Sequence, residues 1–108
     1  MSRAARTARE RGELSPALPD LRRLHAFVIV AEELHFRRAA ARLMMAQSPL
    51  SRVIQRLEHD VGATLFIRSR RSVRLTRAGE ALLADARELL RSTQHAVERA
   101  RLAQTGQA

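Results

Sequence analysis

The sequence predicts a mainly α-helical protein, with a core of three helices, a short β-hairpin and a long last helix. Two observations lead to this prediction. Apolar residues recur at helical spacing in three stretches between residues 20 and 62, and again over residues 76–103. Residues 64–76 hold two short apolar runs on either side of a polar tip, which is typical of a hairpin. A chain of 108 residues has room for one such domain.

The charge of the chain is strongly positive and unevenly placed. All twenty basic residues are arginines, and the formal net charge is +9. Residues 21–75 hold eleven of these arginines against four acidic residues, so most of the excess lies in the segment with the best folding signals. This balance predicts a polyanionic partner, either nucleic acid or an acidic membrane surface. Codon bias in a GC-rich genome also accounts for the absence of lysine.

The composition excludes several classes of protein. The chain has no cysteine, which rules out disulfides and cysteine-ligated zinc. No stretch approaches eighteen consecutive apolar residues, and the N-terminus lacks the apolar block of a secretion signal. We therefore expect a cytoplasmic protein without a membrane partner.

The first two helices are expected close together. Residues 1–19 lack apolar periodicity and end in two prolines, and we expect a disordered arm there. Asp20 has the properties of an N-cap for a helix that runs to about Leu34. A shorter pattern from Phe36 to Leu43 predicts a second helix of two to three turns.

The third helix, residues 48–61, carries the pattern on which the functional prediction depends. Ser48 followed by Pro49 predicts an N-cap with proline at the first helical position, and Gly62 predicts the end of the helix. One face of this helix is an apolar stripe, formed by Leu50, Ile54, Leu57 and Val61. The opposite face is polar and consists of Ser48, Ser51, Arg52, Gln55, Arg56 and His59.

The last helix is expected to begin after Thr76 as its N-cap and to run to about Ala103, with a disordered tail over residues 104–108. It holds two interleaved heptad series. Together they form a broader apolar face than packing on one domain requires, so we expect a second copy of the helix to pack there. The alternative is a wide face used only within the chain. The residues expected in the dimer are Leu82, Leu83, Ala86, Leu89, Leu90, Thr93 and Val97.

The predicted element order is that of a winged helix-turn-helix: helix, short helix, tight turn, helix and hairpin. Residues 20–75 would form this DNA-binding domain, and residues 76–103 a linker helix for dimerisation. A helix is about 10–12 Å wide, which matches the roughly 12 Å major groove. In the third helix, Arg52 and Arg56 are candidates to bond guanine, Gln47 and Gln55 to bond adenine, and Ser48 and Ser51 to face phosphate.

The hairpin is expected to act as the wing. Arg68, Arg70, Arg71 and Arg74 place four positive charges in seven residues. A narrow minor groove over A·T pairs attracts arginine, so we expect Arg70 or Arg71, at the tip of the wing over residues 68–72, to enter it. For Arg68 and Arg74 a structural role or a plain phosphate contact is at least as well supported.

A series of spaced motifs runs through residues 21–83: the Phe27–Ala31 run before Glu32, Phe36 with Ala39-Ala40, Gln47–Ser51, Leu57-Glu58, Gly62, Leu65-Phe66 with Arg68, and Leu75-Thr76 with Ala78-Gly79. Together they resemble the N-terminal region of LysR-type transcriptional regulators, over about four-fifths of the chain. The resemblance implies DNA contacts by Gln47, Pro49, Ser51 and Arg52, and a minor-groove contact by Arg71. It also implies dimers or tetramers, formed through the long helix, on interrupted palindromes.

The chain departs from the family pattern at several positions. His35 and Arg37 stand where serine and threonine are common, which implies a weaker cap for the second helix and an added phosphate contact by Arg37. Ala46 stands where a serine often caps the recognition helix. Family members continue into an effector-binding domain, and because this chain stops after the linker helix, we expect no small-molecule pocket in it.

Other functions are less well supported by the sequence. The four histidines are scattered along the chain, and no nucleophile and base have the spacing of a catalytic pair. We therefore expect neither an enzyme, nor a metal site, nor a cofactor. A sequence-neutral architectural protein remains an alternative, because charge alone gives non-specific DNA binding. A third possibility is a protein that uses its long helix to sequester full-length regulators in mixed dimers.

Overall fold

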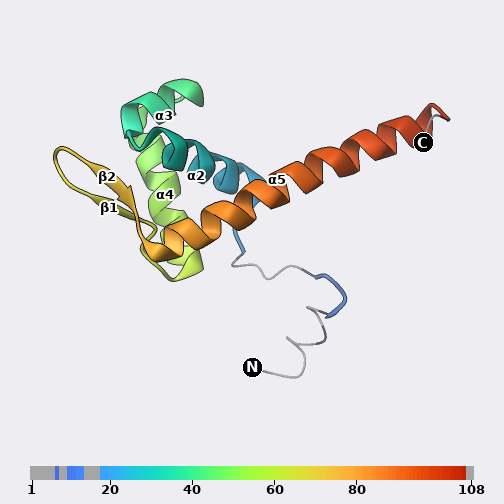
Figure 1. The fold of residues 1–108 in the computed structure, drawn as a ribbon, viewed down its shortest axis with the longest axis horizontal. Helices are drawn as coiled ribbons and strands as arrows, with labels where there is room; N and C mark the ends of the chain where they lie inside the picture. Colours follow the sequence, from blue (N-terminus) through green and yellow to red (C-terminus); the bar gives the residue numbers. More distant parts are fainter. Residues whose placement is uncertain (1–6, 8–9, 14–17, 107–108) are drawn as a thin grey trace.

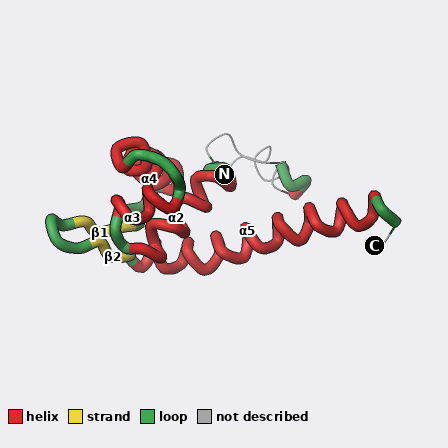
Figure 2. The backbone as a smooth tube through the Cα atoms, turned by 90° about the horizontal axis from the view of Figure 1, so that it is seen from above, coloured by secondary structure: helices red, strands yellow, loops and turns green. Residues whose placement is uncertain are grey.

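The computed structural model describes residue 7, residues 10–13 and residues 18–106. The elements follow one another in the order α2 (Leu21–Glu33), α3 (Phe36–Arg42), α4 (Gln47–Val61), β1 (Phe66–Arg68), β2 (Val73–Leu75) and α5 (Arg77–Gln104). The helices α2, α3 and α4 pack together, the hairpin projects from one side, and α5 runs past α2 and out on the other side (Figures 1 and 2). The winged helix-turn-helix prediction is confirmed. Most of the predicted N-terminal arm lies outside the described residues.

The ends of α2 and α3 are closed by side chains. The Asp20 carboxylate accepts a hydrogen bond from the Arg23 amide at 2.9 Å, as an N-cap does. His35 caps α3 with its ring, because its Nδ1 accepts from the Arg38 amide at 3.1 Å. The imidazole therefore supplies the capping acceptor, which the expectation of a weaker cap overlooked. Between the two helices, Leu34 adopts the left-handed conformation with φ of 50°.

The start of α4 differs from the prediction. Ala46 is the N-cap, in extended conformation and without a side-chain hydrogen bond, and Ser48 and Pro49 are the second and third residues of the helix. The prediction of Ser48 as the cap is therefore wrong. Proline is tolerated there because its missing N–H belongs to the first turn, where amides have no partner within the helix. At the other end Gly62, with φ of 79°, closes the helix as predicted.

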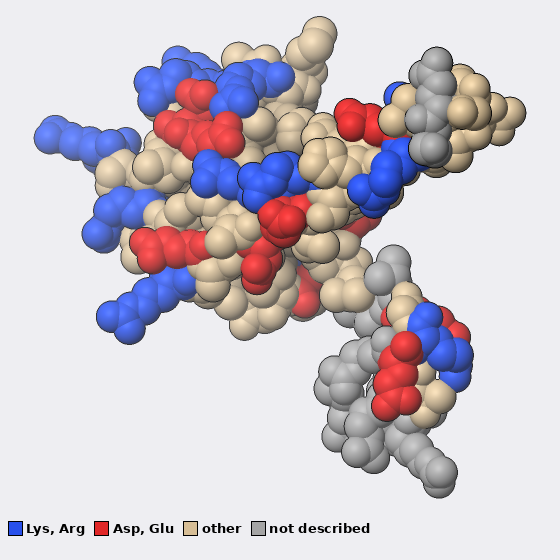
Figure 3. Space-filling view, turned by 45° about the vertical axis from the view of Figure 1, so that its right-hand side comes forward, with Lys and Arg blue, Asp and Glu red and all other residues tan. Residues whose placement is uncertain are grey.

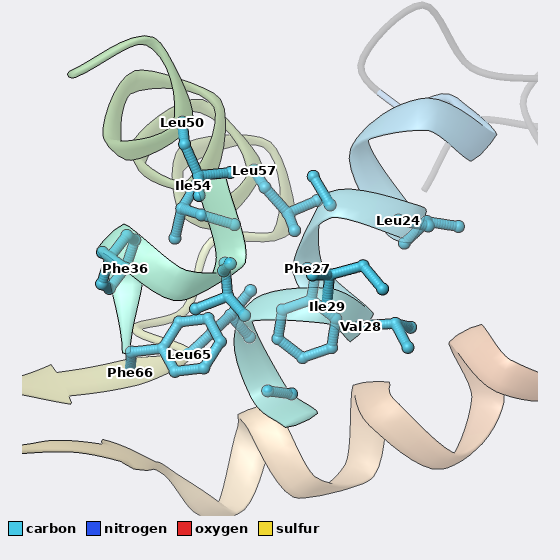
Figure 4. Close-up of a cluster of buried hydrophobic side chains, with 14 of the residues drawn as sticks. Leu24, Phe27, Val28, Ile29, Phe36, Leu50, Ile54, Leu57, Leu65 and Phe66 are labelled. Atoms are coloured by element: carbon cyan, nitrogen blue, oxygen red, sulfur yellow. The ribbon is translucent and has the colours of Figure 1, made fainter. Parts of the chain in front are cut away.

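The core lies where α2 meets the other helices and the base of the hairpin. Figure 4 shows Phe27 of α2 in one cluster with Leu50, Ile54 and Leu57 of α4, and all four side chains are fully buried. The Phe27 and Phe66 rings pack with their centroids 5.4 Å apart. Because α2 contacts α3, α4 and α5, it is buried on more sides than the single stripe that its sequence suggested.

The hairpin and α5 are tied to α4 at one junction. The Glu58 carboxylate accepts hydrogen bonds from the amides of Leu65, at 2.7 Å, and Phe66, at 3.3 Å. The Thr76 hydroxyl donates to the Thr64 carbonyl at 2.6 Å and accepts from the Gly79 amide at 3.0 Å, which caps α5 as predicted. The junction therefore sets the directions in which the hairpin and α5 leave the domain.

The first half of α5 packs on the domain, and its second half extends away (Figure 1). Ala86 is fully buried against the core, and the Arg87 guanidinium lies 3.4 Å from the Glu32 carboxylate of α2. Residues 91–106 are exposed in the isolated chain. Among the described residues, no helix combines the length and apolar character needed to cross a membrane.

Candidate nucleic-acid interface

The helix α4 turns a polar face outward while its other face is buried. Leu50, Ile54 and Leu57 lie in the core, whereas Arg52 and Gln55 are exposed. Within the described part of the chain, neither Arg52 nor Gln55 makes a side-chain hydrogen bond or ion pair. Their donors and acceptors are therefore available to a ligand along the length of the helix.

The first turn of α4 leaves backbone donors available as well. The amides of Gln47 and Ser48 have no carbonyl four residues earlier within the helix, and Ala46 offers no side chain to accept from them. Both residues are exposed. A helix N-terminus with unpaired amides attracts an anion such as a phosphate. Because no side chain caps α4, these amides remain available for the predicted phosphate contact.

Arg56 differs from Arg52 in its surroundings. Its Nε lies 3.2 Å from an oxygen of Asp60, one turn along α4, and Arg23 of α2 lies 3.0 Å from the other oxygen. The Asp60 side chain is only 6% exposed, so the two guanidinium groups offset part of the cost of burying its carboxylate. Arg56 therefore has a structural partner that the sequence pattern did not indicate, and its predicted contact with guanine is less favoured than that of Arg52.

The wing is a short antiparallel hairpin whose tip presents two arginines. Phe66 pairs with Leu75 and Arg68 pairs with Val73. Two hydrogen bonds close the turn. The Ser69 amide donates to the Ser72 carbonyl at 2.8 Å, and the Ser72 amide donates to the Ser69 hydroxyl at 3.1 Å. Arg70 and Arg71 stand between these two serines, and both are exposed.

Arg68 reaches back from the wing to the helices. Its guanidinium carbon lies 3.8 Å from the centre of the Phe36 ring, and its Nη1 lies 3.4 Å from the Ser51 hydroxyl. Partial burial lowers the pKa of the Arg68 guanidinium, against an opposing effect of the Glu58 carboxylate. Arginine still keeps its charge at neutral pH. A cation held over a ring in this way contributes about 0.5–2 kcal/mol.

A cleft of about 440 Å³ separates the wing from the start of α3 and α4. Arg37 and His35 line it from α3, Gln47 from α4, and Arg68, Arg70 and Arg71 from the wing. The cleft therefore brings together predicted contacts from three elements: Arg37, Gln47, Arg70 and Arg71. In Figure 3, arginine side chains project from the end of the molecule that carries the wing.

A second, apolar groove of about 1050 Å³ lies on the other side of the domain. It is bounded by the start of α2, the end of α4 and the first half of α5, and its apolar lining residues are Leu18, Pro19, Leu21, Leu24, Val61, Leu82 and Leu89. Leu89 is 50% exposed. Further along α5, Thr93 and Val97 continue its exposed face.

Four residues predicted to form the dimer contact the domain's own core. Ala86 is fully buried within the chain, so its assignment to dimerisation is corrected. Leu82, Leu83 and Leu90 are partly buried and pack against the core, and Leu82 also lines the apolar groove. A heptad pattern shows which residues share a helix face, but it does not distinguish packing within the chain from packing between chains. Leu82, Leu89, Thr93 and Val97 remain candidates.

Sequence comparison shows which proteins this chain is similar to. Residues 21–80 match the family model described as bacterial regulatory helix-turn-helix protein, lysR family. The uncharacterised helix-turn-helix-type transcriptional regulator YnfL of Escherichia coli is 53% identical over 89 residues, which cover 82% of this chain and 30% of YnfL. The regulator BudR of Klebsiella aerogenes is 51% identical over 76% of this chain and 57% of its own length. The chain thus spans less than two thirds of these relatives.

Solved structures of similar fold cover a similar share of this chain. The DNA-binding domain of BenM, in complex with catB site 1 DNA, has a TM-score of 0.80 and 38% identity, covering 83% of this chain and 97% of that one. The DNA-binding domain of CbnR in a DNA complex has a TM-score of 0.77 and 41% identity, covering 79% and 98%. Full-length CbnR, a LysR family transcriptional regulator, has a TM-score of 0.75 and is covered over 29% of its length.

Proposed function

The chain belongs to the LysR family of bacterial regulatory helix-turn-helix proteins, and we propose that it binds double-stranded DNA sequence-specifically and thereby regulates transcription. The observation that carries the proposal is the two-sided character of α4, with a buried apolar face and an outer face on which Gln47, Ser48, Arg52 and Gln55 are exposed. The DNA complexes of the BenM and CbnR domains support the same use of this fold. A DNA partner in a bacterium also implies a cytoplasmic location.

Each part of the interface would have a separate task. The exposed face of α4 would lie in the major groove, where the Arg52 guanidinium can bond guanine O6 and N7, and Gln47 or Gln55 can bond adenine. The first turn of α4, with Ser48 and Pro49, would rest on a phosphate, with Ser51 just beyond that turn. Arg37 would bind the backbone beside it. The wing would place Arg71, with Arg70 beside it, in the adjacent minor groove.

A selection experiment separates this proposal from a sequence-neutral architectural role. The protein is incubated with random-sequence duplexes, and the bound fraction is amplified and sequenced. We expect an interrupted palindrome, bound at physiological salt at least roughly 10³-fold more tightly than random DNA. Enrichment of no sequence, or a preference of only a few fold, would support the architectural role and contradict specific regulation.

Arg71→Ala is expected to weaken binding of the selected duplex roughly tenfold at 0.15 M salt and to lower the slope of log K against log salt by about 1 for each wing. The reason is that Arg71 contributes charge in the groove rather than base readout. Titrations at several salt concentrations measure both quantities. On duplexes with G·C pairs under the wing the loss should shrink, since the groove there is wider and less negative. An unchanged slope would contradict the placement of Arg71.

We also propose that two copies pair through α5, with the apolar groove and the exposed face of Leu89, Thr93 and Val97 covered by the second copy's α5. The groove is continuous with that face through Leu82 and Leu89. A dimer presents two recognition helices, which is what a palindrome requires. The mass of the wild-type protein, measured by light scattering, decides whether dimers associate further into tetramers.

Leu89→Glu combined with Val97→Glu should convert the dimer to a monomer, because two charges would be buried against an apolar partner. Light scattering measures the mass, and circular dichroism should show that the monomer keeps its helical content, since both side chains are half-exposed in the single chain. The control is Gln94→Glu with His95→Glu, which adds charges on other faces of the same stretch and should leave the dimer intact. Dimers that survive the first pair of changes would refute the interface.

A further inference from the structure

The wing is held firmly at its base and sparsely towards its tip. At the base, Phe66 is buried, and the Glu58 carboxylate accepts from the amides of Leu65 and Phe66. Each strand has only three residues, and beyond Phe66, Ile67 is 46% exposed. On the other strand Val73, which pairs with Arg68, is partly buried against the core. A two-stranded hairpin has little stability of its own, so a contact from the end of β1 would help the tip to keep one position relative to α4.

Arg68 is placed to do this. Arg68 is the one arginine of the hairpin with a side-chain contact to another element of the described chain. Within the described residues, Arg70, Arg71 and Arg74 make no side-chain hydrogen bond, ion pair or ring contact. The Arg68 guanidinium covers the Phe36 ring of α3 and reaches the Ser51 hydroxyl of α4, at 3.8 Å and 3.4 Å. It thus bridges the last residue of β1 to the first turn of α3 and to the exposed side of the recognition helix, at the inner wall of the cleft.

We propose that Arg68 is a positioning residue that sets the distance between the wing and α4, so that Arg71 enters the minor groove in register with the bases that Arg52 reads. The inference rests on the proposed function. Holding the tip in its bound position before DNA arrives reduces the ordering cost of binding, which is the general benefit of preorganisation. The role differs from a plain phosphate contact, in which Arg68 would add affinity independently of Arg71.

The consequence is that Arg68 and Arg71 depend on each other in DNA binding. With Arg68 in place, loss of Arg71 should weaken binding of the selected duplex roughly tenfold. In an Arg68→Ala background the tip is no longer held, so most of the benefit of Arg71 is already gone, and loss of Arg71 should cost less than about threefold. A phosphate contact would instead leave the tenfold loss unchanged.

The test is a double-mutant cycle of Arg68→Ala and Arg71→Ala, measured as affinity for the selected duplex. The matched control is the cycle of Arg74→Ala with Arg71→Ala, because Arg74 carries the same charge on the same hairpin but makes no hydrogen bond, ion pair or ring contact with α3 or α4. We expect coupling in the first cycle and additivity in the second. Additive losses in both cycles, or equal coupling in both, would overturn the proposal.

A second measurement needs no DNA and separates this inference from the proposed function. Backbone order parameters from NMR relaxation should fall over residues 69–72 in Arg68→Ala and stay unchanged in Arg74→Ala. Thermal unfolding of both variants verifies that the domain remains folded. Order parameters that are unchanged in Arg68→Ala would overturn the inference even if the wild type binds its duplex specifically. A wild type without sequence preference would overturn the proposed function whatever the wing does.

Discussion

Gly79→Ala is expected to lower the free energy of unfolding by about 3 kcal/mol, although alanine is a better helix former than glycine. Gly79 lies in the first turn of α5, against Leu65, the loop residue that precedes β1. A Cβ built on it would lie 2.3 Å from the Leu65 carbonyl oxygen and 2.8 Å from Leu75 Cδ2. The Leu65 oxygen is backbone and accepts from the Thr76 amide at 3.0 Å, so it cannot move without opening the junction of hairpin and α5.

Chemical denaturation followed by circular dichroism measures this effect, and a fall in Tm of more than roughly 10 °C should accompany it. Gly62→Ala is the matched control. There the added Cβ has nothing within 4 Å, and the cost arises only from the left-handed φ of 79°, about 1 kcal/mol. If the two variants are equally stable, the close approach of α5 to Leu65 does not contribute as described.

Arg52→Ala is expected to weaken binding to the selected duplex by about 1–3 kcal/mol, roughly 5- to 150-fold, with a much smaller loss on random DNA. Arg52 is exposed on α4 and has no partner within the described residues, so its guanidinium fork is available to a guanine. Repeating the selection with this variant should show relaxed preference at one base pair in each half-site.

Arg56→Ala is the control for this prediction. It removes the same charge from the same helix, but the Arg56 guanidinium is bonded to Asp60 and is less available to a base. Its loss on the selected duplex should therefore be smaller and should not change the preferred sequence. Equal, sequence-blind losses from both variants would contradict the assignment of base readout to Arg52.

Local signals predicted most of the fold because they depend on residues close in sequence. Helices begin after Asp20 and Thr76, and one ends at Gly62, as the capping side chains and the backbone freedom of glycine indicated. Ser48 is not the N-cap of α4, although serine followed by proline is a good local signal for the start of a helix. A cap contributes only about 1 kcal/mol, and the helix begins one residue before Ser48, at Gln47.

The candidate site was predicted less completely, because part of it depends on contacts between distant residues. The helical period indicated which residues share the outer face of α4, but not that Asp60, held also by Arg23 37 residues away, would bind Arg56. It likewise did not indicate that Arg68 would cover Phe36. The broad apolar face of α5 was recognised, but its division between core and partner required the position of α2, which buries Ala86.

The central claim is that the exposed face of α4 meets base edges in the major groove. Because the chain has no cysteine, Gln55→Cys creates a single attachment point on that face for a short photo-crosslinking reagent, and Glu98→Cys creates another far along α5. We expect irradiation of the Gln55→Cys complex with its selected duplex to give crosslinks to bases within each half-site, and irradiation of the Glu98→Cys complex to give none there. Crosslinks absent from position 55, in a complex that still forms with the selected duplex, would contradict the account.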